Sequence, residues 1–334
     1  MLNRHRMKIL YAIQGTGNGH VSRAREIIPL LQQYGELDIL LSGTQVDVGL
    51  QQTVKYRFHG FSFIFGRRGG VDFYGTWKNM DMACFRRQMK SLPLDEYNLI
   101  INDFEPICAW ACKLQNRESV ALSHQAAFIS PHVPRPPGSN WGQFILKHYA
   151  PTTQHVGFHF HRYDGHIHTP VIRSEIRSLK TRNDGHYTVY LPALADKIVL
   201  AMLRQFPAIK WEVFSKHASH TYTQGNIRVM PVHNDAFISS LSACEGLFTG
   251  GGFEGPAEAL FFGKKLLVAP MRAQYEQQCN AYALEQLGIP VIWPDTKDWL
   301  ACIRRFVGTR QAVHFDFPDE TAAIVDRLVR DFSR

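Results

Sequence analysis

The sequence predicts an α/β protein of two Rossmann-like domains, each with a parallel sheet covered by helices, facing one another across a cleft. Three observations predict this fold. Apolar strands alternate with helical segments along the chain, two strands run into glycine-rich turns, and 334 residues exceed the usual size of a single core. We expect a first domain over 1–168, a second over 169–315, and a terminal helix within 316–334 that packs back on the first domain.

The composition is that of a soluble globular protein, with 45% apolar and 20% charged residues. The apolar run that follows the basic first residues is too short for a signal peptide or a membrane span, so we expect a cytoplasmic location. The six cysteines have no C-x-x-C spacing and are expected to be reduced. The net charge of +8 is dispersed, and no nucleic-acid-binding module accompanies it.

In the first domain, a glycine loop follows the first strand and ends in a histidine. The loop contains Gly17, Asn18 and Gly19, and His20 stands at the start of the next helix. A histidine there can take a proton from a hydroxyl near neutral pH, although a role in capping or packing the turn remains open. Further strands are expected at 8–13, 37–42, 58–65, 99–102 and 120–123, and helices at 78–92 and 107–114.

Polar residues follow two of these strands at the edge where open α/β sheets bind ligands. Asp103 either orients His20, contacts an acceptor, or caps the helix that follows it. His124 is expected on the acceptor side. The loop 66–77, rich in glycine, arginine and aromatic residues, either grips a phosphate-bearing acceptor, contacts a membrane surface, or is simply solvated.

The stretch 155–168 is rich in histidine. His159 and His161 alternate with aromatic residues as on a strand, and no cysteine or carboxylate cluster accompanies them. We therefore favour structural histidines and expect no metal site.

The second domain repeats the alternation, and its stretch 244–281 has the residues of a nucleotide site. A short strand runs into Gly250, Gly251 and Gly252, and a helix is expected to start near Pro256. Free N–H groups and the helix dipole favour a phosphate there, and Glu258 is placed to hold ribose hydroxyls. Other elements are expected at 186–191, 196–205, 211–214, 227–230 and 318–332.

Taken together, these motifs resemble the GT-B glycosyltransferases, most nearly the peptidoglycan lipid-linked N-acetylglucosaminyltransferase group and its uncharacterised relatives. GTGNGH at 15–20, PVIR at 170–173, and the glycine triplet with Glu258, Pro270 and the pair 276–277 carry the resemblance. It implies inverting, metal-independent transfer of a hexose or N-acetylhexosamine from a nucleoside-diphosphate sugar, with UDP the expected nucleotide, to a hydroxyl on a carbohydrate, lipid-linked or small-molecule acceptor. His20 would be the base, and no cofactor is implied.

The resemblance also implies a set of donor-binding residues. Arg173 would reach the phosphates, the N–H groups of the loop would face the diphosphate, and Glu276 and Gln277 would bind the donor sugar. His233 lies in the loop expected to contact the base. The full donor set is Arg173, His233, Gly250, Gly251, Gly252, Phe253, Glu254, Gly255, Glu258, Glu276 and Gln277.

Two departures from the family pattern concern the phosphate site. Gly255 replaces a serine or threonine, and Glu254 places a negative charge near the expected phosphate unless it points away. The turn 191–194 also lacks the usual glycines. A nucleotide-sugar 2-epimerase and a non-catalytic protein that binds sugar nucleotides or lipids are therefore retained as alternatives, as is peripheral contact with the inner face of the membrane.

Overall fold

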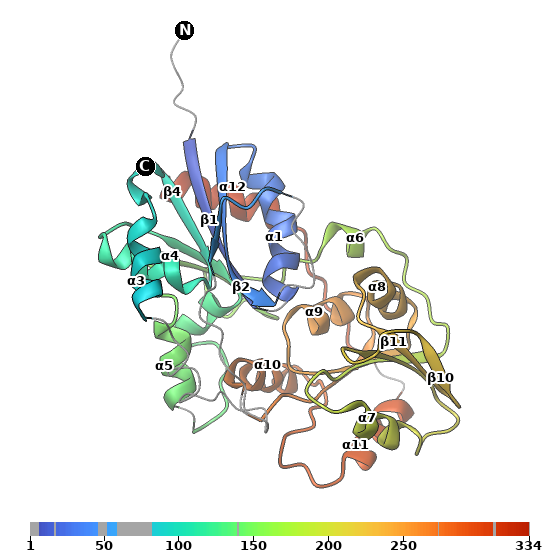
Figure 1. The fold of residues 1–334 in the computed structure, drawn as a ribbon. Helices are drawn as coiled ribbons and strands as arrows, with labels where there is room; N and C mark the ends of the chain where they lie inside the picture. The colour runs from blue at the N-terminus through green and yellow to red at the C-terminus, as the bar shows by residue number, and fades with distance from the viewer. Residues whose placement is uncertain are drawn as a thin grey trace.

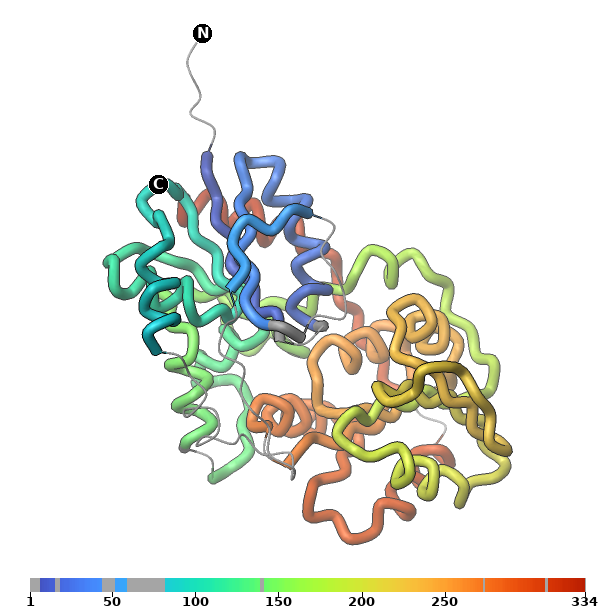
Figure 2. Tube along the Cα trace, viewed as in Figure 1, coloured from blue at the N-terminus to red at the C-terminus, as the bar shows by residue number. Residues whose placement is uncertain are grey.

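The computed structural model of the chain (Figure 1) describes residues 7–16, 18–45, 52–58, 82–138, 140–272, 274–309 and 312–333. Figure 2 shows the first half of the chain, blue to green, in one lobe and the yellow-to-orange part in a second lobe. The red C-terminal segment returns to the first lobe.

The first sheet has seven parallel strands in the order β3-β2-β1-β4-β5-β6-β7. Alternate residues of the central strand β1 point to opposite faces of the sheet, and helices cover both faces. Tyr11 and Ile13 pack with helix α1, whereas Leu10 packs with α3 and α4. The bounds are β1 (Met7–Thr16), β2 (Gly35–Gln45), β3 (Tyr56–Phe58), β4 (Leu99–Asp103), β5 (Val120–Ser123), β6 (Gln154–Phe158) and β7 (Ile167–His168), with α1 (Asn18–Leu31), α3 (Met82–Ser91), η1 (Leu94–Glu96), α4 (Pro106–Leu114), η2 (Gln125–Ile129) and α5 (Asn140–His148).

The second sheet has six strands in the order β10-β11-β9-β8-β12-β13, and only the edge strand β10 pairs antiparallel among its described residues. The predicted fold class, two parallel-dominated sheets with helices around them, is confirmed. The bounds are β8 (His186–Tyr190), β9 (Lys210–Ser215), β10 (Tyr222–Gln224), β11 (Ile227–Pro231), β12 (Gly246–Thr249) and β13 (Lys265–Val268), with α7 (Asp196–Leu203), α8 (Asn234–Ala243), α9 (Glu254–Phe261), α10 (Tyr275–Gln286) and α11 (Trp299–Gly308).

The connection between the sheets carries a short helix, α6 (Ser174–Arg177), and the chain ends in α12 (Thr321–Phe332). Helix α12 lies against α1 in the first lobe (Figure 1). Its buried face includes Val325 and Leu328, and Asp326 accepts a hydrogen bond of 3.0 Å from the hydroxyl of Tyr34. The last helix of the chain is therefore anchored on the first sheet's helical layer.

Three sequence expectations need correction or limitation. Asp103 does not cap α4, because the carboxylate of Glu105 accepts the N–H groups of Ile107 and Cys108 at 2.9 and 2.6 Å. Helix α9 begins at Glu254, two residues before the expected start. Beyond β3, the predicted strand 58–65 and the loop 66–77 lie outside the described residues.

None of the described helices is both long and apolar enough to cross a bilayer. The six cysteines are free thiols. Within the described part of the chain, no group of three or more histidine, cysteine or acidic side chains is arranged to hold a metal ion. His159, from the histidine-rich stretch, is fully buried and its Nδ1 accepts the N–H of Phe160 at 2.9 Å.

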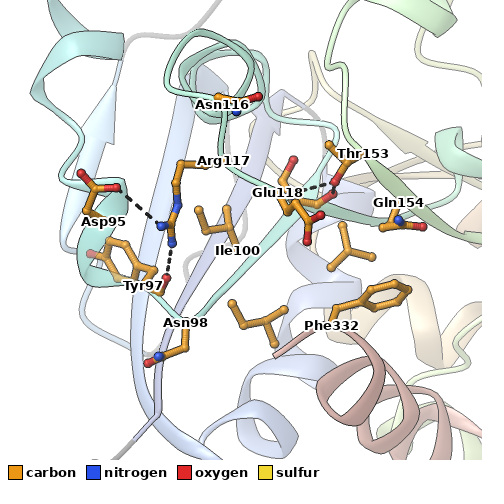
Figure 3. A pocket seen from close by; sticks show the side chains of 13 residues that line it. Asp95, Tyr97, Asn98, Ile100, Asn116, Arg117, Glu118, Thr153, Gln154 and Phe332 are labelled. Carbon is orange, nitrogen blue, oxygen red and sulfur yellow. Dashed lines mark hydrogen bonds and ion pairs between the residues drawn. The ribbon is translucent and has the colours of Figure 1, made fainter. Parts of the chain in front are cut away.

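A polar pocket of about 270 Å³ opens at the amino-terminal edge of the first sheet (Figure 3). Tyr97, Arg117 and Thr153 line it together with Phe332 from the end of α12, and Arg117 donates to the carbonyl oxygen of Tyr97 at 2.6 Å. Asp103 ends β4 at the opposite edge of the sheet. This pocket is therefore separate from the residues that the sequence singled out.

Candidate active site

His20 and Asp103 form a hydrogen-bonded pair at the carboxyl edge of the first sheet. Asp103 is the last residue of β4, in register with Ile13 of β1, and the chain turns from β1 into the helix that carries His20. Nδ1 of His20 lies 2.7 Å from Oδ1 of Asp103, which is fully buried, and the histidine side chain is 12% exposed. The structure thus brings together two residues that the sequence only suggested as partners.

The protonation of this pair follows from its surroundings. Burial would raise the pKa of the Asp103 carboxyl, but the adjacent Arg23 guanidinium lowers it below its ordinary value. The carboxylate is therefore ionised and only accepts hydrogen bonds, so its 2.7 Å contact with His20 is a hydrogen bond when the proton is on Nδ1. Nη2 of Arg23 also lies 3.1 Å from Nδ1. In the neutral ring the other nitrogen, Nε2, has a lone pair and can act as a base.

Arg23, one turn after His20 on α1, holds the same carboxylate. Its Nη2 donates to both oxygens of Asp103 at 2.7 and 2.9 Å, and its Nε donates to Oδ2 at 3.1 Å. The remaining Nη1 donates to Oε1 of Glu254 at 2.7 Å. Burial alone would lower the pKa of Arg23, but the two carboxylates raise it, so its charge is fixed.

Glu254, whose charge raised a question about phosphate binding, is directed at the first lobe. It begins α9, and Figure 1 shows this helix beside the lower end of α1. A Cβ at Gly19 would lie only 2.5 Å from Oε2 of Glu254, so a larger residue at Gly19 would displace the carboxylate. The negative charge is thus taken up by Arg23.

The glycine loop between β12 and α9 is held from behind by α10. A Cβ at Gly251 would lie 2.6 Å from the carbonyl oxygen of Gln277, so only glycine fits there. The amide oxygen of Gln277 accepts the N–H groups of Gly251 and Met271 at 3.3 and 3.1 Å. Around Gly252 and Gly255 the space is open, and the first N–H groups of α9 have no partner within the helix. This arrangement suits an anion.

Behind that loop, Glu258 forms a buried ion pair with Arg173 from the interlobe connection. Nε of Arg173 donates to Oε1 of Glu258 at 2.7 Å, and its Nη1 donates to Glu175 and Asn234 at 2.6 and 2.8 Å. Burial raises the pKa of Glu258 although Arg173 opposes the shift. In this structure Arg173 holds Glu258, so its expected phosphate contact is not part of the observed arrangement.

The two lobes also meet around Phe253 of the glycine loop. Its ring stacks on His124 with centroids 3.8 Å apart and lies 4.9 Å from Phe160. Nε2 of His124 lies 2.7 Å from the amide oxygen of Asn280, whose amide nitrogen donates to the carbonyl oxygen of Gly251. His124, expected on the acceptor side, is instead buried in the contact between lobes, and burial lowers its pKa.

Comparison with known protein families identifies the family of this chain. The family model described as Glycosyl transferase family 1 matches residues 7–308, which include both sheets, His20, Asp103 and the glycine loop. The chain belongs to glycosyl transferase family 1. No curated protein matches it.

Solved structures with the same fold are distant in sequence from this family 1 member. The glycosyltransferase SnogD from Streptomyces nogalater is 13% identical, with a TM-score of 0.54, and the match covers 98% of this chain and 96% of that one. UGT89C1 from Arabidopsis thaliana, complexed with UDP-L-rhamnose, is 13% identical with a TM-score of 0.58, covering 98% and 94%. The calicheamicin glycosyltransferase CalG4 is 16% identical with a TM-score of 0.57, covering 98% and 94%. They show that this family 1 chain has the GT-B fold.

Three of the remaining predicted site residues of this family 1 glycosyltransferase lie in the described part of the chain, on different elements. Oε1 of Glu276 accepts from the amide of Gln125 in the first lobe at 3.0 Å. His233 is exposed, directly before α8. Asn18 begins α1, and Gly17 lies outside the described residues.

Sequence reasoning missed Arg23, which contacts both Asp103, the partner of His20, and Glu254, which follows the glycine triplet. The available signal was its spacing, because a residue three positions after His20 lies on the same side of the helix. Asn280 lies at the end of the stretch 244–281 and was given no role, because its place between His124 and the glycine loop depends on the fold.

Proposed function

We propose that this family 1 glycosyltransferase moves a hexose or N-acetylhexosamine from a UDP-sugar to a hydroxyl acceptor, with inversion and without a metal ion. One observation carries the proposal. The His20–Asp103 pair of the first lobe and the glycine loop of the second lobe meet, since Arg23 donates hydrogen bonds to Asp103 on one side and to Glu254 on the other. A base and an anion site brought together in this way suit transfer from a diphosphate donor to a hydroxyl.

The chemistry uses the free nitrogen of His20. Nε2 takes the proton of the acceptor hydroxyl, and the oxygen forms a bond to the anomeric carbon of the donor sugar. The bond between that carbon and the diphosphate oxygen breaks, and its electron pair leaves with the nucleoside diphosphate. A single displacement inverts the anomeric carbon. Asp103 holds the ring and stabilises the imidazolium that forms.

The leaving diphosphate is proposed to lie at the start of α9. The open space at Gly252 and Gly255 admits it, and the helix N–H groups and dipole stabilise its charge without a metal ion. Arg173 occupies Oε1 of Glu258, which leaves Oε2 to accept hydroxyls of the ribose. Support for uridine as the base comes from the fold neighbour complexed with UDP-L-rhamnose.

An acceptor subsite is proposed at a hollow of about 180 Å³ beside the base. Phe104, Gln125, Leu146 and His155 are among its lining residues. The Phe104 ring is parallel to that of His20, with centroids 6.5 Å apart, and Phe104 has a positive φ of 56°, a strained conformation that recurs at functional sites. Because Gln125 also bonds Glu276, the hollow adjoins the residue expected to hold the donor sugar.

The experiment has two stages. Thermal unfolding with UDP, GDP, ADP and dTDP should show stabilisation by UDP, since a ligand of the native state raises its stability. Turnover of UDP-sugars with carbohydrate, lipid-linked and small-molecule acceptors is then measured with and without EDTA. We expect product with an inverted anomeric centre and no effect of EDTA.

Other outcomes would replace the proposal. No stabilisation by any nucleotide contradicts a donor site at the glycine loop. Conversion of UDP-N-acetylglucosamine in the absence of an acceptor would indicate a 2-epimerase. Binding of UDP without any product across the acceptor panel would indicate a binding protein.

A further inference from the structure

Three charged side chains around His20 form one cluster whose members come from both lobes. Asp103 ends β4, Arg23 lies on α1, and Glu254 begins α9. Their side chains are 0%, 3% and 27% exposed, and each neighbouring pair is joined by a hydrogen bond of 2.7 Å. The donor-side helix therefore contributes a charge to the site of the base.

The sum of the charges determines how well the cluster supports a base. In a histidine–aspartate pair, the carboxylate stabilises the imidazolium that forms when the ring takes a proton. Here Arg23 binds both oxygens of Asp103, so those two groups alone have no net charge. Glu254 adds one negative charge, and the cluster then balances a protonated His20.

Among the described residues, the further charges that Glu254 acts on electrostatically are Arg173 and Glu258, and these two form an ion pair with each other. The hydroxyl of Tyr11, from β1, lies 3.5 Å from Oδ2 of Asp103, and the ring of Phe158, from β6, lies 5.9 Å from the Arg23 guanidinium carbon. Phe104 lies beside the His20 ring. Because these neighbours are aromatic and largely buried, the charges of Asp103 and Arg23 are weakly screened, whereas Glu254, 27% exposed, is partly screened by solvent.

We infer that Glu254 activates His20 when the lobes close, because its carboxylate neutralises Arg23 and so frees the negative charge of Asp103 to support the base. Arg23 and Glu254 are then positioning residues that couple the donor loop to the base. This inference rests on the proposed function. When the lobes separate, Glu254 leaves with α9, and His20 faces an Asp103–Arg23 pair without net charge. His20 is therefore a strong base only in the closed enzyme, in which the donor loop is in place.

The test is Glu254→Gln, which keeps the shape and an oxygen that accepts from Arg23 but removes the charge. Turnover is followed from pH 5 to 9 with saturating donor. We expect the acid limb of the kcat–pH profile to move to lower pH by about one unit, because His20 is a weaker base without the charge of Glu254. For the same reason, the plateau value of kcat should fall about 3- to 10-fold. KM for the donor should stay equal or decrease, since a negative charge beside the diphosphate is removed. Glu254→Asp should restore the wild-type profile in part.

Glu320→Gln is the matched control, because Glu320 precedes α12 and pairs with Arg162 of the first lobe, away from His20. Its profile should equal that of the wild type. The inference is overturned if Glu254→Gln keeps the wild-type acid side, if its donor KM rises while kcat holds, or if Glu320→Gln gives the same shift.

A readout without turnover separates this inference from the proposed function. The NMR signal of the His20 ring, assigned with His20→Gln, is titrated in the wild type and in Glu254→Gln. A signal that protonates at lower pH in the variant supports the coupling even if no UDP-sugar is turned over. Equal titration in the two proteins refutes the coupling even if transfer is established.

Discussion

Asp103→Asn tests the His20–Asp103 pair most directly, because the hydrogen bonds from Arg23 determine the orientation of the asparagine amide. Oδ2 of Asp103 accepts from both Nε and Nη2 of Arg23, at 3.1 and 2.9 Å. At Oδ2 an asparagine NH₂ group would face two arginine donors, whereas at Oδ1 it would face one, Nη2 at 2.7 Å, together with a histidine nitrogen that accepts in its other tautomer. The asparagine oxygen is therefore expected at the Oδ2 position. The NH₂ group is then directed at Nδ1 of His20.

That orientation reverses the tautomer of the histidine. Nδ1 accepts from the asparagine, so the proton moves to Nε2, the nitrogen that should take the proton of the acceptor. The same substitution beside the catalytic histidine of a serine protease lowers kcat by about 10⁴, and we expect a fall of about 10³ to 10⁴ here. This corresponds to about 4–5 kcal/mol of transition-state stabilisation.

The assay is kcat for sugar transfer, with UDP binding measured by calorimetry as a check on the second lobe. Asp38→Asn is the matched control, since Asp38 is also a largely buried aspartate of the first sheet, accepting from Tyr97 at 2.7 Å. It should lose stability but keep kcat. If folded Asp103→Asn with normal UDP affinity retained kcat within tenfold of the wild type, the assigned tautomer would be wrong.

Three further variants test two other residues of the site and the buried cap of α4. His20→Ala should lower turnover at least about 100-fold with little change in UDP affinity, measured by kinetics and calorimetry, and unchanged turnover would remove His20 from the role of base. Glu258→Gln should weaken UDP binding about 10- to 100-fold, the value of a hydrogen bond to a charged group, but should not weaken binding of 2′,3′-dideoxy-UDP; equal losses for both would refute a ribose contact. Burial raises the pKa of Glu105 from 4.5 to about 7, so the unfolded state ionises first and stability should decrease by up to about 3 kcal/mol as the pH rises from about 4.5 to 7. Urea unfolding at pH 5 and 8.5 should show this decrease in the wild type and not in Glu105→Gln, and the same decrease in both would show that another group causes it.

The alternation of strands and helices was predictable because periodicity and glycine turns are local properties of the sequence. The expected strand 99–102 became β4 (Leu99–Asp103), and Asp103 lies beside His20 because β1 and β4 are neighbours in the parallel sheet. The antiparallel edge strand β10 (Tyr222–Gln224) was missed, since three residues are too few to give a periodic signal.

The contacts between lobes could not be predicted from local patterns. Arg23 lies 231 positions from Glu254, and His124 lies 156 positions from Asn280. Sequence reasoning assigned each residue to the ligand of its own domain, so Arg173 was expected on phosphate and His124 on an acceptor. Both are buried against protein partners, because a buried charge or ring nitrogen requires a partner that only the folded chain provides.

The two buried arginines of the site differ in where their partners lie. Arg173 and Glu258 belong to the connection and the second lobe, so the proposed opening of the lobes would leave their ion pair intact. The pair of Arg23 with Glu254 and the stacking of Phe253 on His124 cross between the lobes, so the same opening would break them. These two contacts come from the residues directly after the glycine triplet, and two further contacts between the lobes, His124 with Asn280 and Gln125 with Glu276, come from α10. A donor bound at the glycine loop, as proposed, would therefore contact the segment that carries Glu254 and Phe253, so the proposal places donor binding, closure and proton abstraction on one element of the structure.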